Sequence, residues 1–164
     1  MKKLFLIGGT MGVGKTTVAQ YLKKQLPNSV FLDGDRCWDA SPFRVTEETK
    51  RMVMDNICFL LNGFLHCSAY NNVIFCWVLH EQEIIDAIIN RTDVANCEVK
   101  IVSLTASKET LAKRIMGDVT NGIRTADVLD RSLARSPFYQ KLTSIKIETD
   151  GKTVQEIAEE ISLL

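Results

Sequence analysis

The sequence of 164 residues predicts an α/β fold with one five-stranded parallel sheet and helices on both faces. Short apolar runs recur along the chain, and segments with helical spacing of apolar residues separate them. Strands that alternate with helices form βαβ units, whose strands pair in parallel. A glycine-rich loop also joins the first apolar run to the first helix, as in phosphate-binding units. No repeat or linker interrupts residues 1–164, which indicates a single domain.

The first unit carries a complete phosphate-loop motif. Residues 4–7 are apolar and predict a buried strand, and residues 17–26 predict a helix. The sequence between them matches G-x-x-x-x-G-K-T, and its position between a strand and a helix makes the match specific. The motif and the residue after it are the expected cofactor-binding residues: Gly9, Thr10, Met11, Gly12, Val13, Gly14, Lys15, Thr16 and Thr17.

The motif explains how phosphate would bind. Glycines let backbone N–H groups turn toward phosphate oxygens, and the helix N-terminus adds a partial positive charge at the same place. Lys15 supplies a cation for the β- and γ-phosphates, and the hydroxyl of Thr16 is suited to Mg²⁺. The sequence therefore predicts that the chain binds a nucleoside triphosphate.

Two aspartates follow the second predicted strand, residues 30–32. Asp33-Gly34-Asp35 is also a turn signal, but its place at the ligand end of a buried strand favours function. A carboxylate there can hold a metal-bound water or accept a proton from an attacking hydroxyl. We assign Asp35 as the catalytic base and Asp33 as a metal-side residue with Thr16, and the reverse assignment stays open.

The remaining elements follow in alternation. Thr46 is the expected N-cap of a long helix, and apolar spacing continues that helix to Leu65. After it, the sequence predicts a strand at 73–79, a helix at 81–90, a strand at 99–104 and a helix at 107–116.

The C-terminal third adds two helices and the last strand. Thr125 is expected to cap a helix that reaches Arg135, which Pro137 ends. Residues 145–148 predict a strand that is partly polar and therefore lies at an edge of the sheet. The spacing of Thr153 and Glu156 predicts a capping box for the last helix.

Several polar residues follow strand ends. In open α/β sheets ligands bind beyond the carboxyl ends of the strands. The phosphate loop, the aspartate pair, His80 and Glu81 all follow such ends, so one crevice is expected to collect them. A structural histidine is commoner than a catalytic one, so function is the minority interpretation for His80.

Arginines cluster late in the chain. Arg114 lies in a predicted helix, and Arg124 follows a predicted loop that contains Gly117, Asn121 and Gly122. Arginines on a closing lid position a phosphoryl group and neutralise its charge, although surface ion pairs are the alternative. The expected catalytic residues are the charged groups around the nucleotide: Lys15, Asp33, Asp35, Arg114 and Arg124.

Composition argues against some classes of protein. The 20 basic and 20 acidic residues give zero net charge, which argues against a nucleic-acid partner. No apolar stretch reaches transmembrane length, so no membrane partner is expected. The 5 cysteines are an odd number without a C-x-x-C pattern, which indicates buried free thiols and a cytoplasmic protein.

The phosphate loop, Leu32-Asp33-Gly34-Asp35, Leu111-x-x-Arg114 and the arginine-bearing lid together resemble the small P-loop kinases of nucleosides, nucleotides and metabolites. Shikimate, gluconate and adenylylsulfate kinases and chloramphenicol phosphotransferase belong to that group. The resemblance implies a P-loop NTPase fold with a short arginine-bearing lid, ATP and Mg²⁺ as cofactors, and an acceptor held over the aspartates. It also implies that Arg114 lies against the nucleotide and that the loop near Lys152 approaches the base.

Departures from these kinases leave the acceptor open among small molecules, nucleosides and nucleotides. Val78-Leu79-His80 stands where shikimate kinases have three glycines, and Cys37-Trp38 stands where gluconate kinases have a histidine. Trp77-Val78 occupies the region of the usual Walker B acid. The function expected is an ATP-dependent phosphotransferase, and the alternative is a degenerate ATP-binding protein or switch without transfer. Trp38, Phe43, Arg44 and Arg51 either line an acceptor pocket or pack ordinarily.

Overall fold

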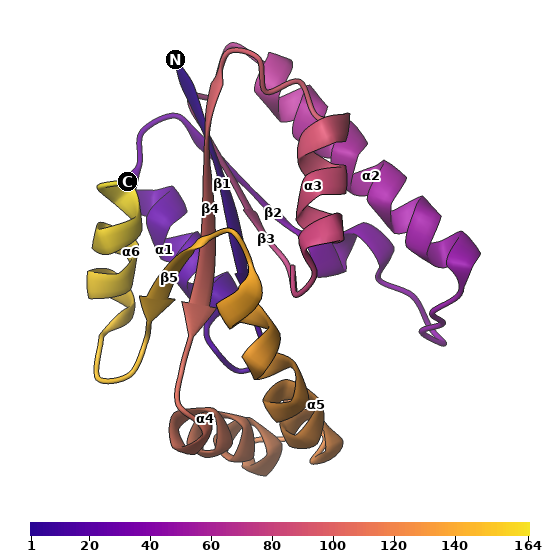
Figure 1. Ribbon diagram of the computed structural model, residues 1–164, viewed down its shortest axis with the longest axis vertical. Coiled ribbons are helices and arrows are strands. Elements are labelled where there is room, and N and C mark those ends of the chain that lie inside the picture. Colours follow the sequence, from indigo (N-terminus) through magenta and orange to yellow (C-terminus); the bar gives the residue numbers. More distant parts are fainter.

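The computed structural model describes residues 1–164 as a five-stranded parallel sheet between layers of helices (Figure 1). The strand order is β2-β3-β1-β4-β5. The strands are β1 (Lys2–Gly9), β2 (Ser29–Asp33), β3 (Asn72–Cys76), β4 (Cys97–Thr105) and β5 (Ile145–Glu148). The predicted fold class is confirmed, and the partly polar β5 lies at an edge as its sequence predicts.

Helices cover both faces of the sheet and the region beyond its strand ends. The α-helices are α1 (Lys15–Gln25), α2 (Glu47–His66), α3 (Gln82–Arg91), α4 (Lys108–Thr120), α5 (Asp127–Arg135) and α6 (Val154–Ser162), with 3₁₀ helices η1 (Gly34–Trp38) and η2 (Ser136–Lys141). Figure 1 shows α2 and α3 on one face, α1 and α6 on the other, and α4 with α5 beyond the ends toward which the strands point. None of the helices combines the length and the apolar character that crossing a membrane requires.

The alternation of side chains in β1 divides the core between the two faces. Leu4 and Leu6 are fully buried beneath α2, α3 and η2, while Phe5 and Ile7 are fully buried beneath α1, α4 and α6. Successive side chains of a strand point to opposite faces of the sheet. A strand with helices on both faces therefore has apolar residues at every position. All five cysteines are free thiols, and Cys58 and Cys76 are buried while the other three are partly exposed.

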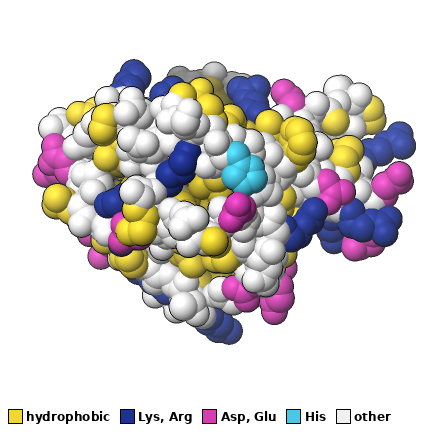
Figure 2. Space-filling model, turned by 90° about the horizontal axis from the view of Figure 1, so that it is seen from above, with side chains coloured by type: hydrophobic (Ala, Val, Ile, Leu, Met, Phe, Trp, Pro, Cys, Tyr) yellow, Lys and Arg dark blue, Asp and Glu magenta, His cyan; other side chains and the backbone are white.

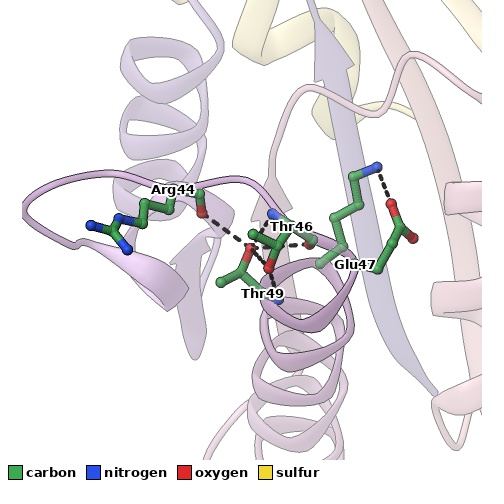
Figure 3. Close-up of polar contacts among 5 residues, drawn as sticks. Arg44, Thr46, Glu47 and Thr49 are labelled. Atoms are coloured by element: carbon green, nitrogen blue, oxygen red, sulfur yellow. Dashed lines mark hydrogen bonds and ion pairs between the residues drawn. The ribbon is translucent and has the colours of Figure 1, made fainter.

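Side-chain caps fix two of the predicted helix starts. At the start of α2, Thr46 Oγ1 accepts from the N–H of Thr49, and Thr49 Oγ1 accepts from the N–H of Thr46 (Figure 3). The predicted capping box of Thr153 and Glu156 is confirmed at α6. The cap predicted at Thr125 is wrong: α5 begins two residues later, and the Thr125 hydroxyl bonds the carboxylate of Asp127.

Two predicted boundaries are also wrong. The predicted strand 73–79 ends at Cys76, because the chain turns out of the sheet at Leu79, whose φ of 39° lies in the left-handed region. The helix predicted at 107–116 continues to Thr120, so Gly117 lies inside α4 and not in the lid loop. The loop before α5 is therefore shorter than expected.

Candidate active site

The phosphate loop connects β1 to α1 through glycines with left-handed backbone. Gly12 has a φ of 80° and Gly14 a φ of 105°, conformations that glycine adopts without steric cost. Gly14 is also the N-cap of α1, and no side chain caps the first N–H groups of this helix. These N–H groups therefore remain available to phosphate oxygens.

A cleft of about 350 Å³ opens beside the loop, between α1, α4 and the start of α6. We call it the loop cleft. Of the predicted cofactor-binding residues, the segment from Gly12 to Thr17 and Arg114 line it. Four cations line the loop cleft against one carboxylate, Asp118: Lys15, Arg114, Arg124 and Lys152. The surplus of positive charge suits a polyphosphate.

The first three residues of the motif do not line the loop cleft. Gly9 is the last residue of β1, and Thr10 is buried. Thr10 Oγ1 donates to the Ser132 carbonyl at 2.9 Å, and Ser132 Oγ donates to the Met11 carbonyl at 2.7 Å. Thr10 and Met11 therefore attach the phosphate loop to Ser132 of α5, a contact that the motif alone does not predict.

Lys15 lies partly buried inside the curve of the loop. Its Nζ donates to the Thr10 carbonyl at 3.0 Å. Burial lowers the pKa of Lys15, the nearby charge of Arg124 lowers it further, and Cys76, Asp35 and Asp33 oppose these effects. A poorly solvated cation beside free helix N–H groups fits a bound triphosphate, because phosphate charge would replace the missing solvation.

Thr16 and Asp33 are in direct contact. Thr16 Oγ1 donates to Asp33 Oδ2 at 3.0 Å, and Asp33 Oδ1 accepts from the N–H of Asp35 at 3.1 Å. Hydroxyl and carboxylate oxygens are metal ligands that Mg²⁺ prefers. No cluster of three or more acidic, histidine or cysteine side chains could hold a metal by itself. Thr16 and Asp33 therefore fit a Mg²⁺ ion that also takes phosphate oxygens and water as ligands.

Asp35 is held by a residue that the sequence did not single out for this role. The Trp77 indole Nε1 donates to Asp35 Oδ1 at 3.0 Å, across 42 residues of sequence. Trp77 stands near the place of the usual Walker B acid, and it is only 8% exposed. The contact fixes one carboxylate oxygen, while Asp35 as a whole stays exposed to an incoming molecule. No local sequence signal could have found it.

Gly34 makes the approach of Trp77 possible. A Cβ at Gly34 would lie 2.5 Å from Trp77 Cγ and 2.7 Å from Cδ1. We expect Gly34→Ala to displace the indole ring, lower stability by about 1–3 kcal/mol as overpacking does, and disturb Asp35. Chemical denaturation and the fluorescence of the tryptophans measure both effects. Gly63→Ala is the matched control, since a Cβ there meets nothing within 4 Å. Equal stability of the Gly34 variant and the wild type would contradict the expectation.

Arg114 links the phosphate loop to the segment after β5 by hydrogen bonds. Its Nη1 donates to the Val13 carbonyl at 3.1 Å and to Thr149 Oγ1 at 3.0 Å. Its Nη2 donates to the Thr149 carbonyl at 3.3 Å. The same side chain lines the loop cleft. Arg114 therefore shapes the phosphate loop and presents positive charge to the loop cleft.

Arg124 lies on the loop between α4 and α5. Its Nε donates to Asp118 Oδ2 at 2.8 Å, and its charge reaches Lys15 strongly enough to lower the pKa of that lysine. Both Asp118 and Arg124 line the loop cleft. Arg131, by contrast, pairs with Asp127 at 2.8 Å on the exposed face of α5, which is the surface ion pair that the sequence allowed.

We expect Arg124→Ala to lower kcat more than ATP affinity. An arginine beside the transferred phosphoryl group contributes most where charge develops in the transition state, and such arginines contribute about 10³–10⁵-fold. Steady-state kinetics with a separate measurement of ATP binding tests this. Arg131→Ala provides the control, because that arginine is already paired on the surface. A loss of ATP affinity with kcat unchanged would make Arg124 a binding contact only.

His80 and Glu81, which were expected in one crevice with the phosphate loop and the aspartates, lie outside the loop cleft. His80 Nε2 lies 3.2 Å from Glu81 Oε1, and its ring lies 6.2 Å from the ring of Phe138 in η2. Neither residue lines the loop cleft. The early end of β3 is the reason, since the turn at Leu79 carries the following residues toward η2. Burial lowers the pKa of His80.

The parallel sheet, the glycine loop and the cationic loop cleft define a P-loop NTPase. Residues 6–132 match the family described as AAA domain, and the chain belongs to that family. Over 174 aligned positions the chain is 29% identical to a shikimate kinase of Francisella philomiragia, with 98% of this chain and 93% of the relative covered. A shikimate kinase of Francisella tularensis subsp. novicida gives the same identity and coverage.

Solved structures share the fold. The tunicamycin resistance protein of Deinococcus radiodurans superposes with a TM-score of 0.74 at 18% identity, over 99% of this chain and 95% of that one. A gluconokinase of Sinorhizobium meliloti gives 0.68 at 16% identity, over 96% and 88%. With these relatives, the resemblance to the small P-loop kinases is confirmed, and the shikimate kinase relatives support an ATP-dependent small-molecule kinase.

Proposed function

We propose that the protein transfers the γ-phosphoryl group of ATP to a hydroxyl group of a small molecule bound beside Asp35. One observation carries this proposal: a single turn, Asp33-Gly34-Asp35, joins a carboxylate on Thr16 of the phosphate loop to a second carboxylate just outside it. Phosphoryl transfer needs both a charged site for the phosphates and a group that receives the acceptor proton.

The loop side of the site would hold the nucleotide. Backbone N–H groups at the start of α1 would bind phosphate oxygens, and Lys15, Arg114 and Arg124 would neutralise their charge. Thr16 and Asp33 would hold Mg²⁺ together with phosphate oxygens and water. When bound, Mg²⁺ neutralises phosphate charge. Lys152 and Val154 also line the loop cleft, and the nucleoside would lie beside them.

Asp35 would act on the acceptor. Its carboxylate accepts the proton of the hydroxyl group as that oxygen bonds to phosphorus and the bond to the ADP oxygen breaks. The products are ADP and a phosphate monoester. The Trp77 indole holds Asp35 Oδ1 at 3.0 Å, which leaves Oδ2 to receive the proton. Trp77 is therefore a positioning residue.

The relatives narrow the acceptor only to small molecules. The shikimate kinase relatives support a hydroxylated acceptor, but Val78-Leu79-His80 replaces the glycines expected of a shikimate kinase in this region. The side chains of this segment close part of the space that glycines would leave, since Leu79 is buried against Gly8. We therefore propose transfer to a hydroxyl group without naming shikimate as its carrier.

Release of ADP in the presence of a panel of nucleosides, sugars, sugar acids and hydroxylated antibiotics tests the proposal. The proposal is supported if the protein releases ADP faster with one of these acceptors than without any, and if the phosphate ester of that acceptor forms. ATP binding without transfer to any member would instead favour a binding protein. That alternative stays open because Trp77-Val78 occupies the region of the usual Walker B acid. Asp35→Asn serves as the inactive control.

A further inference from the structure

We propose that the acceptor carries a planar, fully conjugated ring, as a nucleoside does, and that this ring packs in an aromatic pocket next to Asp35. The inference rests on the proposed function, because it concerns the acceptor of the same site. The aromatic pocket has a volume of about 350 Å³ and lies between η1, the segment 39–46 and α2. Its walls include Trp38, Phe43, Arg44, Met52 and Asn56.

Aromatic contacts link this pocket to the proposed base. The rings of Trp38 and Phe43 are 4.7 Å apart at 72°, and those of Trp38 and Trp77 are 6.3 Å apart at 79°. Trp77 in turn donates to Asp35 at 3.0 Å. A ring that rests against Trp38 or Phe43 would therefore place its substituents near the carboxylate that receives the proton.

The apolar walls of the pocket are uncovered. Phe43 is 57% exposed and Met52 is 43% exposed, although both are large apolar side chains. Packing in the core does not explain this exposure, because neither side chain belongs to the buried clusters of the protein. Exposed aromatic and thioether groups around a hollow are typical of ligand sites.

Most polar groups of the pocket already have partners. The Thr49 hydroxyl bonds the backbone N–H of Thr46 and the Arg44 carbonyl, as Figure 3 shows. Asn56 Nδ2 donates to the Cys37 carbonyl at 2.9 Å, and Arg36 pairs with Asp39 at 3.4 Å. A sugar acid or polyol bound here would leave many of its hydroxyl groups without protein partners.

The Arg44 guanidinium is the exception. Figure 3 shows its side chain extended away from the α2 cap, and no carboxylate pairs with it. A guanidinium stacks on a flat ring or pairs with an anionic substituent of that ring. Together the free groups of the pocket recognise one flat, mainly apolar surface and one polar edge. That combination fits a flat conjugated ring far better than a polyhydroxylated chain or a puckered, hydroxylated ring.

Tryptophan fluorescence tests the inference without relying on catalysis. The chain has only 2 tryptophans: Trp38 lines the aromatic pocket, and the ring of Trp77 lies 6.3 Å from that of Trp38. We expect uridine, guanosine or chloramphenicol to change the emission with saturation, and shikimate and gluconate to leave it unchanged. Phe43→Ala should weaken the binding of the ring-bearing probe by ~10-fold, in line with stacking energies.

Phe59→Ala is the matched control, since Phe59 is 78% exposed on α2 but does not line the aromatic pocket. It should leave probe binding unchanged, and ATP binding by both variants checks that they are folded. Failure of all three ring-bearing probes to bind, or binding of shikimate or gluconate unaffected by Phe43→Ala, would overturn the inference. Ring-specific binding without ADP release would support the pocket and refute only the proposed transfer.

Discussion

Replacing Lys15 with alanine is expected to abolish phosphoryl transfer and weaken ATP binding while the protein stays folded. Lys15 is the only side-chain cation within the loop itself, and Nζ lies inside its curve on the Thr10 carbonyl. Removing a group that stabilises charge in the transition state costs about 10²–10³-fold or more in rate. Turnover assays with calorimetric titration of ATP measure the two losses.

The Lys15→Ala protein should be at least as stable as the wild type. Burial lowers the pKa of Lys15, so the nucleotide-free fold binds this proton less tightly than the unfolded chain does. Below its lowered pKa, the charged lysine therefore reduces the stability of the fold, and alanine removes that cost. We expect a melting temperature no lower than that of Lys24→Ala, an exposed substitution on the same helix. Wild-type turnover by folded Lys15→Ala would refute the site assignment.

The sequence was sufficient for the fold because its local signals and its long-range pattern agree. The phosphate loop, the apolar strands and the capping box at Thr153 each name an element, and βαβ alternation then leaves a parallel sheet. Errors arose at ends of elements. Thr125 has the chemistry of a cap but bonds the Asp127 side chain, and Gly117 continues a helix that its composition suggests ending.

The site was less predictable, because its arrangement depends on contacts between distant segments. The aspartates could be assigned to the strand end that faces the loop, since this follows from the order of elements. The Trp77 indole reaches Asp35 only because Gly34 leaves room for the ring, and no periodicity encodes that contact. The bonds of Ser132 to Thr10 and Met11 are likewise set by how α5 packs. Sequence patterns identify the groups, whereas packing decides their partners.

Asp35→Asn is expected to keep Mg²⁺-ATP binding and to lose transfer by ~10²–10⁴-fold, the usual contribution of a general base. Asparagine keeps the size and the oxygen that accepts from the Trp77 indole, and it removes the capacity to take a proton. Asp33→Asn should instead weaken Mg²⁺-dependent ATP binding, because Asp33 is the carboxylate in contact with Thr16 of the loop at 3.0 Å. Its amide oxygen can still cap η1, so folding is preserved.

Measuring Mg²⁺-ATP affinity and turnover for both variants separates the two roles. Asp86→Asn is the control, since Asp86 is an exposed aspartate on α3 whose side chain accepts from Gln82. When Mg²⁺ is titrated at a fixed ATP concentration, the Mg²⁺ concentration that gives half-maximal ATP binding should rise for Asp33→Asn. It should stay unchanged for Asp35→Asn. Identical profiles would defeat the division of labour, and exchanged profiles would reverse the assignment. Full turnover by both variants would show that neither Asp33 nor Asp35 takes part in catalysis, although one turn holds both carboxylates beside the phosphate loop.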